Sequence, residues 1–150
     1  MGHPSHARGV ATISFTLNGR EVTTVAAPFA SLAETLRCQL GLTGTKLGCA
    51  AGDCGACTVR LDGAQVCACL VATAQAAGAR IETIEWEGPL AADLRAAFLA
   101  HGAAQCGICT PGMLMAAIDL LASKASPTAA ARRRASTPKT AAPSARGCRA

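Results

Sequence analysis

The stretch Gly48-Cys-Ala-Ala-Gly-Asp-Cys-Gly-Ala-Cys-Thr-Val59 places three cysteines in the pattern Cys-x4-Cys-x2-Cys, and a fourth, Cys69, follows after an x11 gap. One short loop can surround an inorganic centre with three soft thiolate ligands, while the fourth ligand arrives from a neighbouring strand. Gly48, Gly52 and Gly55 allow positive φ and close backbone approach. The amides of such a loop can donate hydrogen bonds to sulfur. The stretch therefore predicts a metal-binding loop.

Four thiolates at this spacing are typical of a plant-type [2Fe–2S] cluster. We therefore predict that the cluster ligands are Cys49, Cys54, Cys57 and Cys69. A structural zinc site is the alternative, because zinc also takes four cysteines. Zinc sites usually take them in two closely spaced pairs, so the wider first gap and the single late cysteine fit zinc less well.

Two further cysteines lie near this set in the sequence. Cys38 falls inside a predicted helix and is interpreted as a small core residue. Cys67 stands shortly before Cys69, on the same face of a predicted strand, and is interpreted as core packing. The alternative for Cys67 is a substitute ligand.

The composition restricts the compartment and the partners. The 150 residues include nine cysteines, but no apolar leader at Met1–Val10 and no apolar run long enough to span a membrane. We therefore expect a cytoplasmic protein whose cysteines bind metal and form no disulfides. Residues 1–123 carry seven basic and nine acidic side chains, whereas residues 124–150 carry seven basic and no acidic ones. Because no aromatic residue accompanies these basic residues, a solvated tail is favoured over one that binds nucleic acid or a membrane surface.

Local patterns predict a small α+β domain. Alternating apolar residues, a capping box at Ser31–Glu34 and the turn signals Asn18-Gly19 and Asp62-Gly63 define its elements. In chain order these are a strand at 13–17, a strand at 21–25, a helix at 32–40, an irregular loop at 43–57, a hairpin of strands at 58–61 and 64–70, and a short strand at 81–84. This order describes a mixed sheet covered by one helix.

The pattern becomes helical after Glu85. Asp93–His101 forms one predicted helix, and Thr110-Pro111 is typical of the start of another, with Thr110 as N-cap. Gly112–Leu121 is apolar nearly all round, so this helix should be buried against other helices. The tail at 123–150 shows no periodicity and is predicted to be disordered.

A second motif, Gln105-Cys-Gly-Ile-Cys-Thr-Pro-Gly-Met113, follows the first along the chain. Together the two motifs resemble those of the iron–sulfur subunits of the xanthine oxidase family of molybdenum hydroxylases, which includes carbon monoxide dehydrogenase and aldehyde oxidoreductase. The resemblance covers residues 10–122. It implies a β-grasp [2Fe–2S] ferredoxin domain at 9–84 and a helical [2Fe–2S]-binding domain, only partly present, at 85–122.

The resemblance also implies a function. In the family, electrons pass from molybdopterin on a large subunit, through clusters on the iron–sulfur subunit, to FAD on a medium subunit or to another acceptor. This chain would then transfer electrons within an oxidoreductase and carry no substrate chemistry of its own. The alternatives are a stand-alone [2Fe–2S] ferredoxin and a non-functional or zinc-binding remnant. The second motif argues against the stand-alone carrier, which has no need of a pterin-facing domain.

The resemblance assigns residues of the second motif as well. Cys106 and Cys109 correspond to ligands of a second cluster, and Gln105 to a glutamine that contacts the pterin. The family takes its last two ligands from a Cys-Arg-Cys-Thr-Gly-Tyr segment further along, whereas this chain ends in Arg146-Gly-Cys-Arg-Ala150. Cys148 is therefore a candidate third ligand, and an unrelated cysteine of the tail is the alternative.

Overall fold

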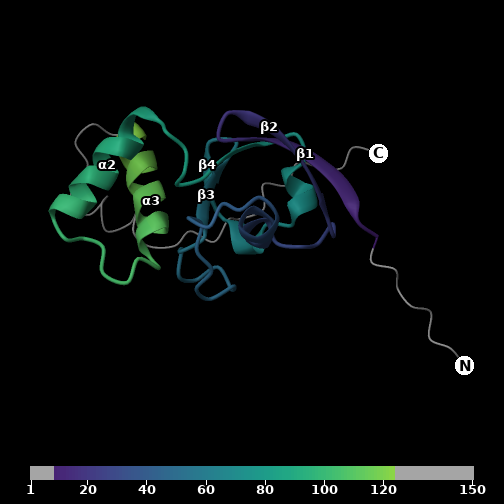
Figure 1. Cartoon of the computed structure of the whole chain (residues 1–150), viewed down its shortest axis with the longest axis horizontal. Helices are drawn as coiled ribbons and strands as arrows, with labels where there is room; N and C mark the ends of the chain where they lie inside the picture. The colour runs from purple at the N-terminus through teal and green to yellow at the C-terminus, as the bar shows by residue number, and fades with distance from the viewer. Residues whose placement is uncertain (1–8, 124–150) are drawn as a thin grey trace, which may run out of the picture.

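The computed structural model describes residues 9–123, which form a sheet and a pair of helices side by side (Figure 1). Five strands make one sheet in the order β2-β1-β5-β3-β4. β1 pairs in parallel with β5, and the other neighbouring strands are antiparallel. The strands are β1 (Ala11–Leu17), β2 (Arg20–Ala26), β3 (Thr58–Leu61), β4 (Ala64–Cys67) and β5 (Arg80–Glu82). The predicted mixed sheet is confirmed.

Two tight turns fix the register of the hairpins. Asn18 and Gly19 have φ values of 50° and 83°, and Asp62 and Gly63 have φ values of 49° and 82°. Positive φ at both central residues defines a type I′ turn, whose twist matches that of the flanking strands. Both hairpins follow from these dipeptides, as the sequence predicts.

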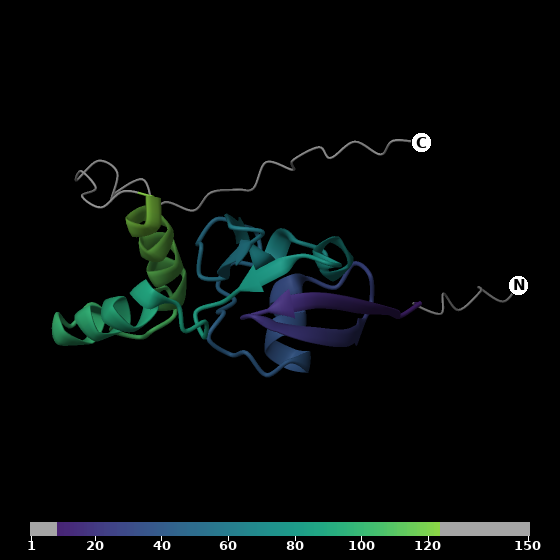
Figure 2. The same ribbon diagram turned by 90° about the horizontal axis from the view of Figure 1, so that it is seen from above.

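One helical segment covers a face of the sheet (Figure 2). α1 (Leu32–Glu34) continues into the π-helical turn η1 (Thr35–Gln39). The amide of Glu34 donates to the side-chain oxygen of Ser31 at 3.2 Å, which is the N-cap contact expected from the capping box. Leu32 and Leu36 are fully buried in the same core cluster as Phe15 of β1. Burial of this apolar stripe holds the helical segment on the sheet.

Two predictions about cysteines in this domain are wrong. The strand expected to reach Leu70 ends at Cys67, and Ala68–Leu70 forms the short 3-10 helix η2, so Cys67 and Cys69 do not share a strand face. The reason is that Cys67 already pairs with Thr58, the first residue of β3. Cys38 is exposed and not part of the core. Helical periodicity places it on the side opposite the buried leucines of its segment.

The remaining elements are η3 (Thr73–Ala76) and two longer helices, α2 (Pro89–Ala100) and α3 (Thr110–Ser123). α2 begins earlier than predicted, with Gly88 as N-cap. The amide of Met113 donates to the carbonyl of Cys109 at 3.0 Å, so Cys109 takes the N-cap place expected for Thr110. Among residues 9–123, neither these helices nor the shorter ones have the length and apolar character needed to cross a membrane.

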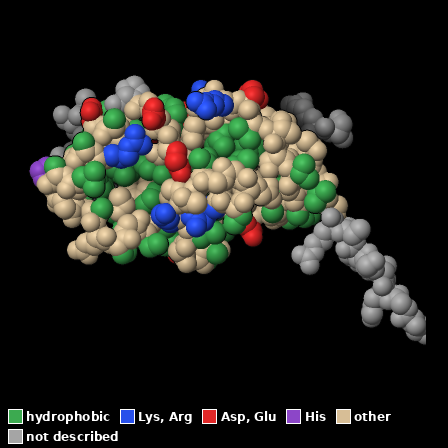
Figure 3. Space-filling model, in the orientation of Figure 1, with side chains coloured by type: hydrophobic (Ala, Val, Ile, Leu, Met, Phe, Trp, Pro, Cys, Tyr) green, Lys and Arg blue, Asp and Glu red, His purple; other side chains and the backbone are tan. Residues whose placement is uncertain are grey.

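α3 is buried on two sides. Met115 and Ile118 pack against Ala91 of α2, and another side of the helix contacts β3 and β4. The predicted burial is thus confirmed, with the sheet as an additional partner. Figure 3 shows hydrophobic side chains at the surface of the end of the molecule where the two helices lie. On the helical pair, Leu99 of α2 is 76% exposed.

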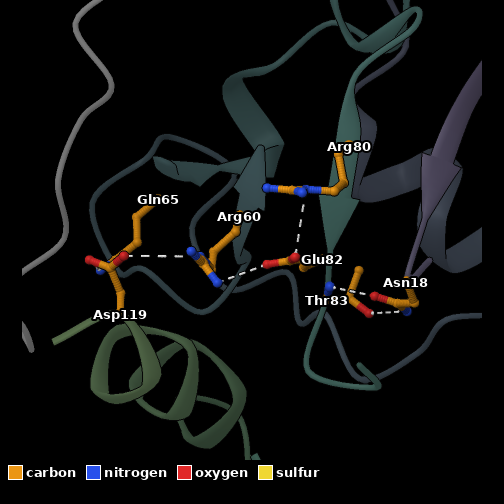
Figure 4. Close-up of polar contacts among 7 residues, drawn as sticks. All are labelled: Asn18, Arg60, Gln65, Arg80, Glu82, Thr83 and Asp119. Atoms are coloured by element: carbon orange, nitrogen blue, oxygen red, sulfur yellow. Dashed lines mark hydrogen bonds and ion pairs between the residues drawn. The ribbon is translucent and has the colours of Figure 1, made fainter. Parts of the chain in front are cut away.

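A chain of polar contacts joins α3 to the sheet (Figure 4). Gln65 of β4 donates to Asp119 of α3 at 2.7 Å, and Nε of Arg60 lies 4.0 Å from the same carboxylate. Arg60 also donates to Glu82 of β5 at 2.9 Å, and Glu82 lies 3.8 Å from Nε of Arg80. The helical pair is therefore tied to three strands of the sheet.

Candidate metal centre

The loop that carries three of the predicted ligands is held at its start by the covering helical segment. Nη1 of Arg37, in η1, donates to the carbonyls of Thr43 and Thr45 at 2.9 and 2.7 Å. The amide of Lys46 donates to the carbonyl of Ala56 at 3.3 Å. The last contact closes the loop. Lys46 precedes Gly48 and Cys49, and Ala56 follows Cys54 and Gly55, so the bond joins the two ends of this segment.

Cys49 and Cys54 form an exposed pair on this loop. The amides of Ala51 and Cys54 donate to Sγ of Cys49 at 3.3 and 3.4 Å, and the Cys54 thiol lies within hydrogen-bonding reach of the same sulfur. These donors, the two amides first, lower the pKa of Cys49 to about 6. Cys49 therefore favours the thiolate at neutral pH, which is the form that binds metal.

Cys57 and Cys69 form a second, more buried pair. Cys57 directly precedes β3 and Cys69 lies in η2, just beyond β4, so the β3–β4 hairpin brings the two together. Their thiols lie close enough that each shifts the pKa of the other. Burial raises the pKa of Cys57, and burial followed by the contact with Cys57 raises the pKa of Cys69 to about 11. The backbone of Gly52 partly opposes this rise in the pKa of Cys69.

The donor set fits a [2Fe–2S] cluster. The two pairs lie within electrostatic reach of each other, because Cys54 raises the pKa of Cys57 and Cys49 raises the pKa of Cys69. Four thiols in two pairs match a centre with two irons and four cysteine ligands. Amides directed at sulfur are the surroundings such a centre uses. Within residues 9–123, no three Cys, His, Asp or Glu side chains gather as ligands of a single metal ion.

The second predicted set lies only partly within the described residues. Cys106 and Cys109 are exposed on the segment that leads into α3, and Gly107 between them has a φ of 82°. Gln105 is exposed on the same segment. Cys148 lies outside residues 9–123. The structure thus places the first three of these residues together on one accessible segment.

Two residues make contacts at the loop that the sequence did not predict. Cys67 is buried in the main core, which confirms its interpretation as core packing, but its thiol also donates to the carbonyl of Gly52 at 3.5 Å. Gly112 of α3 packs on the loop so closely that a Cβ there would overlap the carbonyl oxygen of Gly55. A glycine in the first turn of an otherwise apolar helix is the sequence signal for such a contact.

Known protein families match both halves of the chain. The 2Fe-2S iron-sulfur cluster binding domain matches residues 15–83, and the [2Fe-2S] binding domain matches residues 80–140. The nicotine 6-hydroxylase small subunit of Paenarthrobacter nicotinovorans is 47% identical over 118 residues, which cover 77% of this chain and 71% of that protein. The xanthine dehydrogenase iron-sulfur-binding subunit of Escherichia coli O157:H7 is 44% identical over 113 residues, 74% and 70% of the two chains. The chain belongs to the iron–sulfur subunits of the molybdenum hydroxylase family.

Solved structures of related oxidoreductases share the fold. Quinoline 2-oxidoreductase from Pseudomonas putida 86 superposes with a TM-score of 0.79 and 41% identity, over 84% of this chain and 79% of that chain. Aldehyde oxidoreductase of Megalodesulfovibrio gigas is 46% identical over 116 residues, which cover 75% of this chain but 13% of that longer protein. The iron–sulfur unit therefore occurs both as a separate subunit and as part of a larger chain.

These comparisons confirm the predicted family, the ferredoxin-like domain with a second [2Fe–2S] domain after it, and the electron-transfer role of an iron–sulfur subunit in a molybdopterin-dependent oxidoreductase. They favour a subunit over a stand-alone ferredoxin. The match of the second domain runs to residue 140, beyond the predicted end at 122. The predicted disorder of the tail concerns residues that, after Ser123, lie outside the described part of the chain.

Proposed function

We propose that four cysteines of this subunit bind a [2Fe–2S] cluster through which it passes single electrons within a molybdenum hydroxylase complex. The observation that carries the proposal is the arrangement of these thiols in two pairs, with two backbone amides directed at Cys49. A bound cluster supplies reversible one-electron transfer. The proposed ligands are Cys49, Cys54, Cys57 and Cys69.

The residues around the cysteines supply charge stabilisation and shielding. The amides of Ala51 and Cys54 offset negative charge on the Cys49 sulfur, which favours the more reduced state of the site. Cys57 is buried, whereas Cys49 and Cys54 are exposed. One side of the site therefore faces the sheet. The other side is exposed, so a partner protein can come close enough to exchange electrons with it.

The proposed complex has a large molybdopterin-binding subunit that supplies electrons. An FAD-binding medium subunit, or another acceptor, receives them. The helical unit faces the pterin, with Gln105 as the contact residue. Leu99, Ile108 and Met113 support a covered surface on this unit, because they are 76%, 47% and 40% exposed. We place the complex in the cytoplasm and assign it no nucleic-acid partner.

The division of the chain and its second site belong to the same proposal. We assign residues 9–84 to the ferredoxin domain, 85–122 to the partial helical domain and 123–150 to the tail. Cys106 and Cys109 derive from the ligands of a second cluster, with Cys148 as the candidate third thiol.

The assignment of the first cluster is tested with the full chain, purified without oxygen. Serine replaces each of the four proposed ligands in turn, and iron, sulfide and the paramagnetic resonance spectrum are measured. Each variant should lose about two irons per chain and the matching signal. Cys38→Ser is the control, because Cys38 is exposed on η1. An unchanged signal in Cys54→Ser contradicts the assignment.

A further inference from the structure

The linker 83–88 joins β5 to α2 and is held on one side by the helical pair of α2 and α3. Nη1 of Arg95, in α2, donates to the carbonyl of Ile84 at 2.8 Å. The side chains of Ile84 and Trp86 pack against the core cluster between the two helices. A Cβ on Gly88 would overlap the Trp86 ring, so the ring lies directly on the backbone of the linker. The linker therefore moves with the helical pair.

The first residue of the linker is bonded to the sheet. The amide of Thr83 donates to Oδ1 of Asn18 at 2.9 Å, and Nδ2 of Asn18 donates to the Thr83 hydroxyl at 3.0 Å (Figure 4). Because Thr83 is buried, water does not compete for these two bonds. The linker is thus held at the turn between β1 and β2 as well.

Glu85 joins the linker to the start of the metal-binding loop. Oε1 of Glu85 accepts from the amide of Gly44 at 2.7 Å, and Oε2 accepts from the hydroxyl of Thr83 at 2.5 Å. Hydrogen bonds to a carboxylate are roughly twice as strong as those between neutral groups. One side chain therefore bridges the linker and the segment that leads to Cys49.

Gly44 is packed against the linker without space for a side chain. A Cβ on Gly44 would overlap the Glu85 carboxylate and the side chain of Ile84. The two carbonyls that Arg37 holds belong to the residues on either side of Gly44. The start of the loop is therefore enclosed between η1 and the linker. Close packing of this kind transmits a displacement from one segment to the other.

We propose that Glu85 is a positioning residue that couples the linker, and with it the helical pair, to the start of the metal-binding loop. The seat of the helical pair and the retention of the cluster then depend on the same carboxylate. This inference rests on the proposed function where it concerns the bound cluster. The coupling between linker and loop is a property of the chain and is measurable without iron.

The single tryptophan of the chain, Trp86, makes its fluorescence emission a reporter of the linker. Iron release to a chelator reports on the loop. In the full chain, Glu85→Ala should release iron several-fold faster and shift the Trp86 emission to longer wavelength. Glu85→Gln keeps an acceptor for the Gly44 amide and should stay closer to wild type in both. Glu87→Ala is the control, because Glu87 is exposed on the same linker.

A change on the loop side tests the coupling in the other direction. Gly44→Ala places a methyl group against the Glu85 carboxylate and displaces it from the loop. The Trp86 emission should shift in this variant too, although residue 44 is far from Trp86 in the sequence. The same measurement is made on the full chain after iron is removed.

Each outcome has a separate meaning. Wild-type iron release in Glu85→Ala overturns the proposal, and so does wild-type Trp86 emission in Gly44→Ala. Equal acceleration in Glu85→Ala and Glu87→Ala assigns the effect to lost negative charge and also overturns it. A wild-type chain purified without iron and sulfide refutes the proposed function, whereas the emission of Gly44→Ala still decides the coupling. If Gly44→Ala does not fold, the two readouts of Glu85→Ala and Glu85→Gln decide.

Discussion

Gly112 of α3 lies directly on the backbone carbonyl of Gly55, between Cys54 and Cys57 of the metal-binding loop. The same carbonyl accepts hydrogen bonds from the amide and the hydroxyl of Thr58, at 3.1 and 2.7 Å. The start of the helix that follows Cys109 is therefore in contact with a rigid part of the first cysteine loop. This contact sets how closely the helical unit approaches the proposed cluster.

Substitution of Gly112 by alanine should destabilise the protein. Glycine to alanine inside a helix normally stabilises by up to about 1 kcal/mol. Here the added methyl group overlaps backbone atoms of the loop, so α3 must shift, at a net cost of about 1–3 kcal/mol. The melting temperature should therefore fall. Met113→Ala, at a more exposed neighbouring position, is the control, and a higher melting temperature for Gly112→Ala rules out the close contact.

Asp119 should stabilise the docking of α3 on the sheet. Asp119→Ala removes the hydrogen bond from Gln65 and the charge opposite Arg60. Because the Asp119 side chain is 33% exposed, we expect a loss of only about 1 kcal/mol in the free energy of unfolding. The measurement is denaturant unfolding, with Asp93→Ala on the exposed side of α2 as control.

A double-mutant cycle makes this prediction specific. Gln65→Ala and Asp119→Ala should couple by about 0.5–1 kcal/mol, since both remove the same hydrogen bond. Strictly additive effects mean that the contact contributes nothing in solution.

Arg37 should affect retention of the cluster more than stability of the fold. Its contacts with the Thr43 and Thr45 carbonyls hold the start of the loop, outside the main hydrophobic core. Arg37→Met keeps the length of the side chain and removes the donors. Iron should be released to a chelator several-fold faster, while the melting temperature changes little. Arg20→Met, at an exposed position of β2, should release iron at the wild-type rate, and an equal rate in Arg37→Met refutes the anchoring role.

Local signals in the sequence predicted the features that depend on near neighbours. Asn18-Gly19 and Asp62-Gly63 each specify a turn through their own backbone preferences. The spacing of Cys49, Cys54 and Cys57 likewise belongs to one loop, whose start and end are joined by a backbone hydrogen bond.

Features that depend on distant partners could not be predicted in this way. The end of β4 at Cys67 follows from the point where β3 begins, and it moves Cys69 from a strand into η2. The contact between Gly112 and Gly55 needs the docked position of α3, which no local pattern specifies. The proximity of Cys67 to Gly52 follows from the same hairpin geometry, and sequence spacing alone gave it only the interpretation of core packing.

The second cysteine motif leads to the last prediction, which concerns iron content. Cys106 and Cys109 lie exposed before α3, and the sequence after them holds a single further cysteine, Cys148. A [2Fe–2S] cluster takes four thiolates, and Cys106, Cys109 and Cys148 offer three of them. An iron with an open position is accessible to water and exchanges more readily. A second cluster should therefore be absent or lost on purification.

The purified full chain should contain about two irons and two sulfides, all from the first site. Cys148→Ser, and deletion of residues 124–150, should leave this content unchanged, whereas Cys54→Ser should abolish it. The melting temperature of the deletion variant, compared with that of the full chain, also tests whether the basic tail stabilises the fold. A chain with about four irons that loses half of them in Cys148→Ser makes Cys148 a true ligand. In that case the fourth ligand of the second cluster is not a cysteine of the segment after Cys109, and the helical domain does bind a cluster.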